Sequence, residues 1–283
     1  YFNVELDCDG IPAVKPKIFD PDEAEQLRSR CHGNEAIVTS VKETEKKVKA
    51  PKLYDLTTLQ REANRIYGMT AKQTLDTAQS LYEKKLITYP RTDSQYLTED
   101  MEQTARNVVR QIYEKYQLTG PFDQPEQPDV KKVMNNSKVT DHHAIIPTME
   151  LASSHLDELK SWEEKILFLI AVHTVMAMSK DHIYQETEIE VECQGEIFKA
   201  KGRTVLQDGW KLFENCFKNK DRMAIVDPDQ EMKERMPKVT QGQTFYAVAA
   251  EKTEHFTSPP KPYSDVIFCE RKEWIGIEER SSA

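Results

Sequence analysis

The chain has 283 residues, 38% of them hydrophobic and 31% charged, and a formal net charge of −9. This length allows one large domain or two ordinary ones, and the composition is typical of a globular protein with a hydrated surface. The negative net charge argues against a protein that coats nucleic acid, because phosphate binding needs a positive surface.

Two further features bear on the cellular compartment. The longest apolar run, 166–178, contains His173 and is too short to span a bilayer, and no basic-then-apolar leader begins the chain. Five cysteines are scattered without any C-x-x-C pair: Cys8, Cys31, Cys193, Cys216 and Cys269. This pattern favours reduced thiols over a disulfide scaffold or a zinc site. We therefore expect a soluble, cytoplasmic protein with no membrane partner.

The first fifty residues combine strand and helix patterns. Residues 2–8 alternate between apolar and polar side chains, which predicts a half-buried strand closed by a glycine. Asp20 can cap a following helix, and Gly33 can end it. Another apolar segment, 36–41, runs into a basic and weakly structured stretch, and we expect a domain boundary near 50–53.

From residue 56 the period of the pattern becomes helical. Thr57 or Thr58 can cap a helix that ends at 67, and an apolar stripe over 71–82 predicts a second helix. The tight Gly-Met-Thr turn between them is typical of a helix-turn-helix. Further helices are expected at 101–116, around 150–159 and at 166–178, with a loop over 120–140.

Past residue 181 the alternation of period two returns. It predicts strands at 187–193 and 197–200, joined by a Gln-Gly turn, and another strand at 244–249. Strand patterns thus flank a block of helices, which indicates an α+β protein: an antiparallel β domain interrupted by an inserted, mostly helical domain. The expected division is 1–53 and 182–265 for the β domain, 54–181 for the helical domain, and 266–283 for an exit segment.

The stretch 86–97, L-I-T-Y-P-R-T-D-S-Q-Y-L, places reactive residues in an extended segment. Alternate residues of extended backbone share a face, so Tyr89, Arg91 and Asp93 point one way. Pro90 restrains the residue before it and cannot donate within a central strand, which favours an exposed, rigid edge. Asp93 either holds the guanidinium in place or caps the next turn.

The chemistry of this stretch follows from its residue types. A tyrosine hydroxyl, with a pKa of about 10, is a poor nucleophile near neutral pH. A neighbouring guanidinium helps the phenolate to form and binds a phosphate oxygen. Tyr89 with Arg91 therefore suits attack on a phosphodiester through a covalent phosphotyrosyl intermediate.

Several stretches, in order along the chain, resemble motifs of type IA DNA topoisomerases, especially of the topoisomerase III branch. I-T-Y-P-R-T-D-S at 87–94 resembles the family's active-site tyrosine motif, and L-T-T-L-Q-R-E-A-N at 56–64 resembles the helix that begins its tyrosine-bearing domain. D-H-H-A-I-I-P-T at 141–148 resembles its histidine motif. S-P-P-K-P-Y-S-D at 258–265 resembles the exit toward its DNA-gate domain, and the resemblance extends over roughly 34–265.

By this resemblance, Tyr89 is the nucleophile that forms a 5′-phosphotyrosyl link to one DNA strand. Arg91 steadies the scissile phosphate, and His142 contacts the phosphate or handles a proton, both of which are common roles of histidine side chains. The resemblance also implies a β arch domain, a CAP-like helix-turn-helix, strand passage, and religation without ATP. Further DNA contacts are expected, on weaker grounds, at Thr92, Asp93, Lys46 and Lys47.

The family's Mg²⁺ is held by a Toprim domain, and no such segment is recognisable in this chain. We therefore expect a central fragment of a topoisomerase, with no metal of its own and no activity alone. Its expected partners are single-stranded DNA and the Toprim and gate domains of the same polypeptide. The expected localisation is cytoplasmic and associated with the nucleoid.

Two alternatives remain at this stage. A metal-dependent phosphoesterase would use Asp141, His142 and His143, with help from Asp7 and Asp9, although adjacent residues rarely face one metal. A non-catalytic module would use the helix-turn-helix only to dock DNA or a protein.

Overall fold

The computed structural model describes residues 1–118, 128–213 and 237–257, which form two compact units. The sheet unit comprises Tyr1–Lys47, Ile183–Gln207 and 237–257, and the helical unit comprises Val48–His182 and 208–213. The expected α+β class is confirmed. The motif at 258–265 and the exit segment expected at 266–283 lie outside the described residues. None of the helices in these ranges has the length and apolar character of a transmembrane segment.

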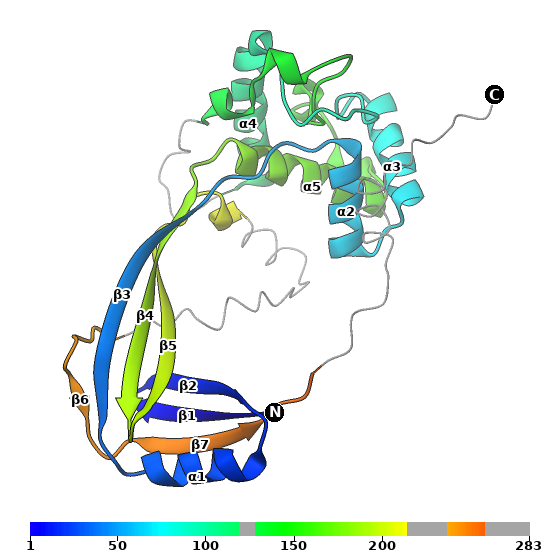
Figure 1. Ribbon diagram of the computed structural model, residues 1–283. Helices are drawn as coiled ribbons and strands as arrows, with labels where there is room; N and C mark the ends of the chain where they lie inside the picture. Colours follow the sequence, from blue (N-terminus) through cyan, green and yellow to red (C-terminus); the bar gives the residue numbers. More distant parts are fainter. Residues whose placement is uncertain (119–127, 214–236, 258–283) are drawn as a thin grey trace. The chain divides into compact units, whose positions relative to one another are not determined.

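The sheet unit is built on one seven-stranded sheet (Figure 1). Its strands are β1 (Phe2–Cys8), β2 (Ile11–Ile18), β3 (Ala36–Val48), β4 (His182–Cys193), β5 (Glu196–Gln207), β6 (Thr244–Phe245) and β7 (Ala249–Glu254). They lie in the order β6-β3-β4-β5-β2-β1-β7, and each pair with a described register is antiparallel. The expected antiparallel sheet is therefore present.

In the hairpin of β1 and β2, the sequence pattern predicted the first strand but not the second. Val4, Leu6 and Cys8 are buried as the alternation predicts, and the turn at Asp9 and Gly10 has φ values of 56° and 85°. β2 was not expected, because two prolines interrupt its pattern. It tolerates them because Val14 provides its one described pairing with β5, so few backbone donors are needed on that side.

Two more expectations about strands are corrected. The basic stretch after residue 41 is not weakly structured: β3 continues through it to Val48, with mostly exposed side chains that give no apolar alternation. Thr39 on β3 donates to the carbonyl of Glu190 on β4 at 3.1 Å. The strand expected at 244–249 is broken into β6 and β7, because Ala247 adopts a φ of 53°, which strand backbone does not allow.

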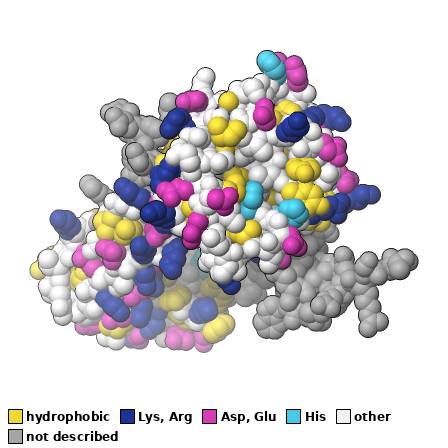
Figure 2. All heavy atoms as spheres, turned by 90° about the horizontal axis from the view of Figure 1, so that it is seen from above, with side chains coloured by type: hydrophobic (Ala, Val, Ile, Leu, Met, Phe, Trp, Pro, Cys, Tyr) yellow, Lys and Arg dark blue, Asp and Glu magenta, His cyan; other side chains and the backbone are white. Residues whose placement is uncertain are grey.

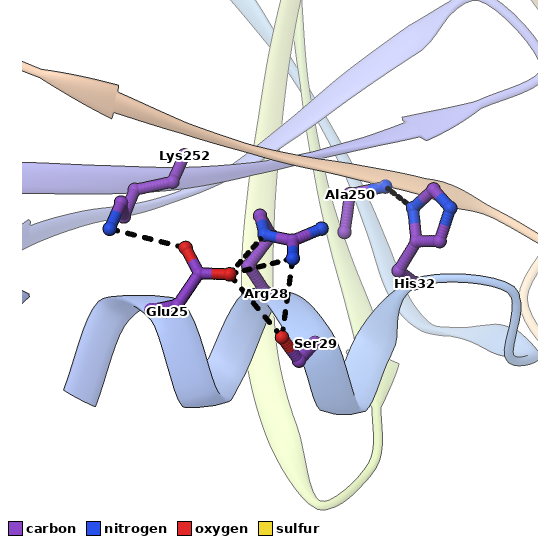
Figure 3. A network of polar contacts seen from close by, with 6 residues as sticks. All are labelled: Glu25, Arg28, Ser29, His32, Ala250 and Lys252. Carbon is purple, nitrogen blue, oxygen red and sulfur yellow. Dashed lines mark hydrogen bonds and ion pairs between the residues drawn. The ribbon is translucent and has the colours of Figure 1, made fainter. Parts of the chain in front are cut away.

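Helix α1 (Pro21–Cys31) lies along β1 and β7 and begins as predicted, with the Asp20 carboxylate accepting from the amide of Asp22 at 2.8 Å. Figure 3 shows the polar contacts that join this helix to β7. Glu25 accepts from Arg28 on the same helix and pairs with Lys252 at 3.1 Å. His32 accepts from the amide of Ala250 at 3.1 Å through Nδ1. These contacts tie both ends of α1 to the neighbouring strand.

The helical unit contains four α-helices in its described residues: α2 (Leu56–Tyr67), α3 (Ala71–Glu83), α4 (Glu102–Tyr116) and α5 (Ser161–Ala177) (Figure 1). Helix α5 contacts the other three and is buried around most of its surface, so it forms the centre of the core. Gly68 ends α2 with a φ of 68°, as its lack of a side chain permits.

Two helix expectations in this unit are wrong. The cap of α2 is Asp55, whose carboxylate accepts from the amide of Thr58 at 2.7 Å, so Thr58 contributes as the third helical residue. The helix expected around 150–159 is absent. Only two 3₁₀ turns, Met149–Leu151 and Leu156–Glu158, occur there, because the segment has a single fully buried anchor, Leu151, and no sustained apolar stripe.

Candidate active site

The stretch 86–97 runs alongside a second extended stretch, 144–148, in the helical unit. The amide of Thr88 donates to the carbonyl of Ile146 at 3.0 Å, and the amide of Thr148 donates to the carbonyl of Leu86 at 3.0 Å. The pairing is confined to isolated bridges such as Ile87 with Pro147, and it ends before Pro90. Because proline has no amide proton, the backbone leaves the ladder there and enters a loop.

Side chains in this loop alternate between buried and exposed positions, as extended backbone predicts. Pro90, Thr92 and Ser94 face the interior, whereas Arg91 and Asp93 are exposed. Of the three residues expected to share a face, Arg91 and Asp93 are exposed and Tyr89 is half-buried. The buried side chain of Thr92, between Arg91 and Asp93, fixes the loop to the core.

Thr92 connects the loop to two distant parts of the helical unit. It is 7% exposed, and its hydroxyl donates to the carbonyl of His142 at 2.9 Å. Its own carbonyl accepts from the amide of Leu56, at the start of α2, at 3.0 Å. Thr92 therefore tethers the loop after Tyr89 both to His142 and to the start of α2.

The ring of Tyr89 lies between two other aromatic rings. The ring centroids of Tyr89 and His142 are 4.4 Å apart with an interplanar angle of 46°. Tyr82, in the last turn of α3, meets Tyr89 edge-on at 5.3 Å and 75°. Residues 53 positions apart in sequence are thereby brought together at the surface, and the two neighbouring rings restrict where the Tyr89 phenol can swing.

Tyr82 is the member of this site that sequence reasoning missed. We placed it in the apolar stripe of its helix together with Leu81. Leu81 is fully buried, but Tyr82 is 40% exposed, because it lies at the edge of the stripe. An available signal was its position seven residues before Tyr89, at the end of the helix that leads into the motif.

Arg91 and Asp93 remain unpaired within the described ranges: neither makes a hydrogen bond or an ion pair there. Of the two alternatives for Asp93, the bridge to the guanidinium of Arg91 is therefore not formed. Arg91 is exposed two residues after Tyr89, and its guanidinium is a donor group suited to a phosphate.

A buried carboxylate supports the end of α3. Glu163, at the start of α5, is 3% exposed and accepts from Ser80 at 2.7 Å, from Lys84 at 2.6 Å and from the amide of Lys160 at 2.9 Å. Burial by itself raises a carboxyl pKa, but these donors and the charge of Lys84 outweigh it and lower the pKa of Glu163 to about 2. The end of α3, which carries Tyr82, is thus fixed to the central helix.

The remaining predicted residues lie elsewhere or make other contacts. Lys46 and Lys47 belong to the sheet unit, where Lys46 lies 3.9 Å from Glu186, whereas the site described here is made by the helical unit alone. His143 turns Nδ1 toward the carbonyl of Ala144 at 2.9 Å. Throughout the described part of the chain, no three His, Cys, Asp or Glu side chains are placed to hold a metal ion. The metal site of the phosphoesterase alternative is therefore not assembled.

Figure 2 shows basic, acidic and hydrophobic side chains interspersed over one face of the molecule. Such mixing agrees with the net charge of −9 and gives that face no single broad sign of charge.

The chain was compared with known protein families and proteins. A family model described as DNA topoisomerase matches residues 1–270. DNA topoisomerase 3 of Bacillus licheniformis is 34% identical over 281 residues, which cover 94% of this chain and 37% of that protein. DNA topoisomerase 3 of Bacillus subtilis is 34% identical over 277 residues, with the same two coverages of 94% and 37%. The chain thus spans little more than a third of the length of these relatives.

Among solved structures, full-length topoisomerase I from Thermotoga maritima superposes with a TM-score of 0.69. The match has 24% sequence identity and covers 98% of this chain and 44% of that one, so it shows a shared fold. The family model, which covers most of the chain, and the relatives at 34% identity together establish kinship. This chain belongs to the type IA DNA topoisomerase family and is homologous to the bacterial topoisomerase 3 enzymes.

Proposed function

We propose that this chain carries the nucleophile of a type IA topoisomerase, and that Tyr89 cleaves one strand of DNA by transesterification. The observation that supports the proposal is the contact between the rings of Tyr89 and His142. Arg91 is exposed two residues after Tyr89 and is unpaired in the described structure. Membership of the topoisomerase family gives this set of residues its substrate, DNA.

The proposed step exchanges one ester for another. The Tyr89 oxygen forms a bond to the phosphorus of a backbone phosphodiester as the bond to the 3′ oxygen breaks. The phenol loses its proton, and the departing 3′ oxygen gains one, which leaves a 5′-phosphotyrosyl link and a free 3′ hydroxyl. Religation reverses these changes. Because the number of ester bonds is conserved, no ATP is consumed.

The neighbouring residues have distinct proposed roles. Arg91 donates to the non-bridging oxygens of the phosphate and stabilises the charge that develops there, which a planar guanidinium does well. His142, whose ring touches that of Tyr89, contacts the phosphate or relays a proton between the two oxygens. Asp93, exposed on the same face, faces the DNA without a partner in the described residues.

The family uses Mg²⁺, and the described residues of this chain do not form a binding site for that ion. No group of three suitable ligands exists among them, and the exposed carboxylates of Asp93 and Asp141 alone do not make a site. We propose that the metal is bound by a Toprim domain of the same polypeptide, which also completes the active site.

The two units have proposed roles of their own. The helical unit, residues 54–181 in the division proposed from sequence, inserts into the sheet unit and presents the nucleophile, with α2 and α3 as a helix-turn-helix-like element. In the same division, residues 1–53 and 182–265 act as the arch through which a second strand passes, and 266–283 leads toward a gate domain. The order of the units along the chain supports this assignment. Lys46 and Lys47 on the arch are proposed as weak DNA contacts.

Trapping of a covalent adduct tests the proposal. The chain is mixed with a Toprim-bearing portion, Mg²⁺ and end-labelled single-stranded DNA, and then denatured rapidly. We expect a labelled protein band with the unchanged chain and none with Tyr89→Phe, which removes one oxygen and little packing.

The control for this experiment is Tyr96→Phe, which makes the same chemical change in a partly buried tyrosine of the same stretch. An adduct that survives Tyr89→Phe would overturn the assignment of the nucleophile. The absence of adduct in every sample, with the two portions shown to associate, would favour the non-catalytic docking module.

A further inference from the structure

A cavity of about 490 Å³ opens in the helical unit, lined by none of Tyr89, Arg91 and His142. Its walls come from the approach to α2 and from one face of α2, together with parts of α5, Gln95 and Trp210. A volume of this size is within the range of pockets that hold small molecules. The site is thus large enough for a ligand and is not part of the reaction centre.

The charge of the lining favours an anion. Lys52 and Arg61 bring two cations, and the one carboxylate, Glu62, accepts hydrogen bonds from Arg65. Lys52 is exposed, with its ammonium 5.5 Å from the ring centroid of Tyr96 and no carboxylate partner in the described structure. The lining thus contains two cations and one carboxylate, on a chain whose net charge is −9.

The lining also contains aromatic rings: Tyr54 is buried, whereas His173 and Trp210 are half-buried. The rings of Tyr54 and His173 are stacked, with centroids 3.7 Å apart and an interplanar angle of 12°. His173 directs Nε2 to the carbonyl of Lys52 at 2.7 Å, and burial lowers its pKa to about 4, so the imidazole is neutral at physiological pH. The neutral ring donates through Nε2 and keeps Nδ1 as an acceptor. Trp210 adds an indole whose Nε1 donates to the carbonyl of Val48 at 3.2 Å.

Hydrogen bonds connect the cavity to the segment that carries the nucleophile. Gln95, which lines the cavity, donates to the carboxylate of Asp55 at 2.9 Å. The next residue, Leu56, donates from its amide to the carbonyl of Thr92 in the loop after Tyr89. Gln95 follows Tyr89 by six residues, so even fully extended backbone places them no more than about 20 Å apart. The cavity is therefore within a few nucleotides of the proposed scissile phosphate.

We propose that this cavity binds one nucleotide of the single strand that Tyr89 cleaves, with the base against the aromatic wall and the phosphate near Lys52 and Arg61. This inference rests on the proposed function, because it takes the ligand from the substrate of that site. Stacking on aromatic side chains tolerates any base, so the cavity adds affinity and position without sequence preference.

The test measures binding of fluorescently labelled oligo-dT by the whole chain, in low salt and without Mg²⁺. All proteins carry Tyr89→Phe, so the result does not depend on the reactivity of that residue. The variants are Lys52→Gln and Trp210→Leu. Their matched controls are Lys131→Gln, an exposed lysine outside the cavity, and Trp162→Leu, a tryptophan that is 49% exposed. Melting temperatures show that each variant is folded.

We expect each cavity variant to weaken binding about five-fold or more, and each control to change it less than about two-fold, since one stacked base contributes at least about five-fold. An oligonucleotide with abasic sites should bind as weakly to the chain that carries Tyr89→Phe alone as normal oligo-dT binds to the Trp210→Leu variant. Equal binding by cavity and control variants would overturn the proposal. So would full competition by inorganic phosphate together with undiminished binding of the abasic strand, which would show an anion site only.

The two proposals fail in different ways. If the cavity variants weaken binding but no adduct forms with Tyr89, the nucleotide site stands and the catalytic assignment falls. If the adduct forms and the cavity variants bind normally, the reaction stands and the nucleotide site is wrong.

Discussion

At the scale of single residues, the central observation is that Tyr89 is held between two rings. Tyr82 touches it edge-on and His142 at a tilt, and edge-on aromatic pairs contribute about 0.5–1.5 kcal/mol beyond the area they bury. A nucleophile gains from such restraint, because attack needs its oxygen in line with the departing oxygen. We therefore propose that Tyr82 positions Tyr89, the proposed nucleophile.

Replacement of Tyr82 tests that role. Tyr82→Ala should slow adduct formation by about two-fold to ten-fold at saturating DNA, the range that 0.5–1.5 kcal/mol implies, and should leave DNA affinity unchanged. Tyr82→Phe keeps the ring and should react at close to the normal rate. A loss of affinity equal to the loss of rate would instead show that Tyr82 binds DNA directly.

Arg91 supports a second prediction at this scale. Arg91→Lys keeps the charge but loses the planar fork, which binds a phosphate through two parallel hydrogen bonds. We expect the rate of cleavage to fall at least about ten-fold, because charge-assisted bonds of this kind contribute about 1.5–3 kcal/mol. The measurement is the adduct assay, with Lys138→Arg as a control for substitution at an exposed cation of the same unit. A normal rate for Arg91→Lys would show that charge alone suffices.

At the scale of elements, Glu163 fixes the start of α5 to the end of α3. Its pKa is lowered from 4.5 to about 2, so the folded state favours the charged form. The stability that this charged form contributes is therefore fully present above pH 4.5 and is lost as the pH falls toward 2. A shift of that size corresponds to about 3 kcal/mol of stability.

Urea unfolding at several pH values measures this contribution. At pH 7, Glu163→Gln should destabilise the chain by roughly 1–3 kcal/mol, and the difference from the unchanged protein should shrink as the pH falls below 4.5. Glu164→Gln, the exposed neighbour, should change stability by less than about 0.5 kcal/mol. A difference that does not depend on pH would show that packing, rather than charge, explains the effect.

Burial stabilises the neutral form of His173 on α5, whereas Glu163 is stabilised in its charged form. Its pKa is lowered from 6.5 to about 4, so the folded state favours the neutral ring, and this contribution is present above pH 6.5 and is lost as the pH falls toward 4. Proton NMR of the histidine rings should show one resonance that titrates near pH 4 and disappears in His173→Gln. Titration of that resonance near 6.5 would contradict the burial argument.

At the scale of the whole molecule, charge predicts how the chain meets DNA. Acidic and basic side chains are interspersed over the face in Figure 2, and the net charge is −9. We expect the chain alone to bind single-stranded DNA weakly, with an affinity that falls steeply as salt rises, and to relax no supercoiled DNA. Electrophoresis of plasmid topoisomers and binding at several salt concentrations check this. For single strands, the slope of log K against log salt is about −0.7 for each phosphate neutralised. Relaxation by the chain alone would contradict the proposed division of the active site between domains.

Much of the local structure was determined by the sequence. Asp20 and Gly68 mark helix ends, and the alternation of Val4, Leu6 and Cys8 defines β1, because caps and periods depend on residues only a few positions apart. The face shared by Arg91 and Asp93 also follows from extended backbone alone. The importance of Tyr89 and Arg91 could be argued from their chemistry, and that of His142 only from family resemblance.

Other features were decided by tertiary structure. The contact of Tyr89 with His142, the burial of Thr92 and the anchoring of Glu163 by Lys84 join residues about 50 to 80 positions apart. The course of β3 through a polar stretch likewise depends on the strand β4 beside it. The local sequence pattern shows only which side chains are buried. Which of these side chains contact one another depends on how the buried faces of distant segments pack together.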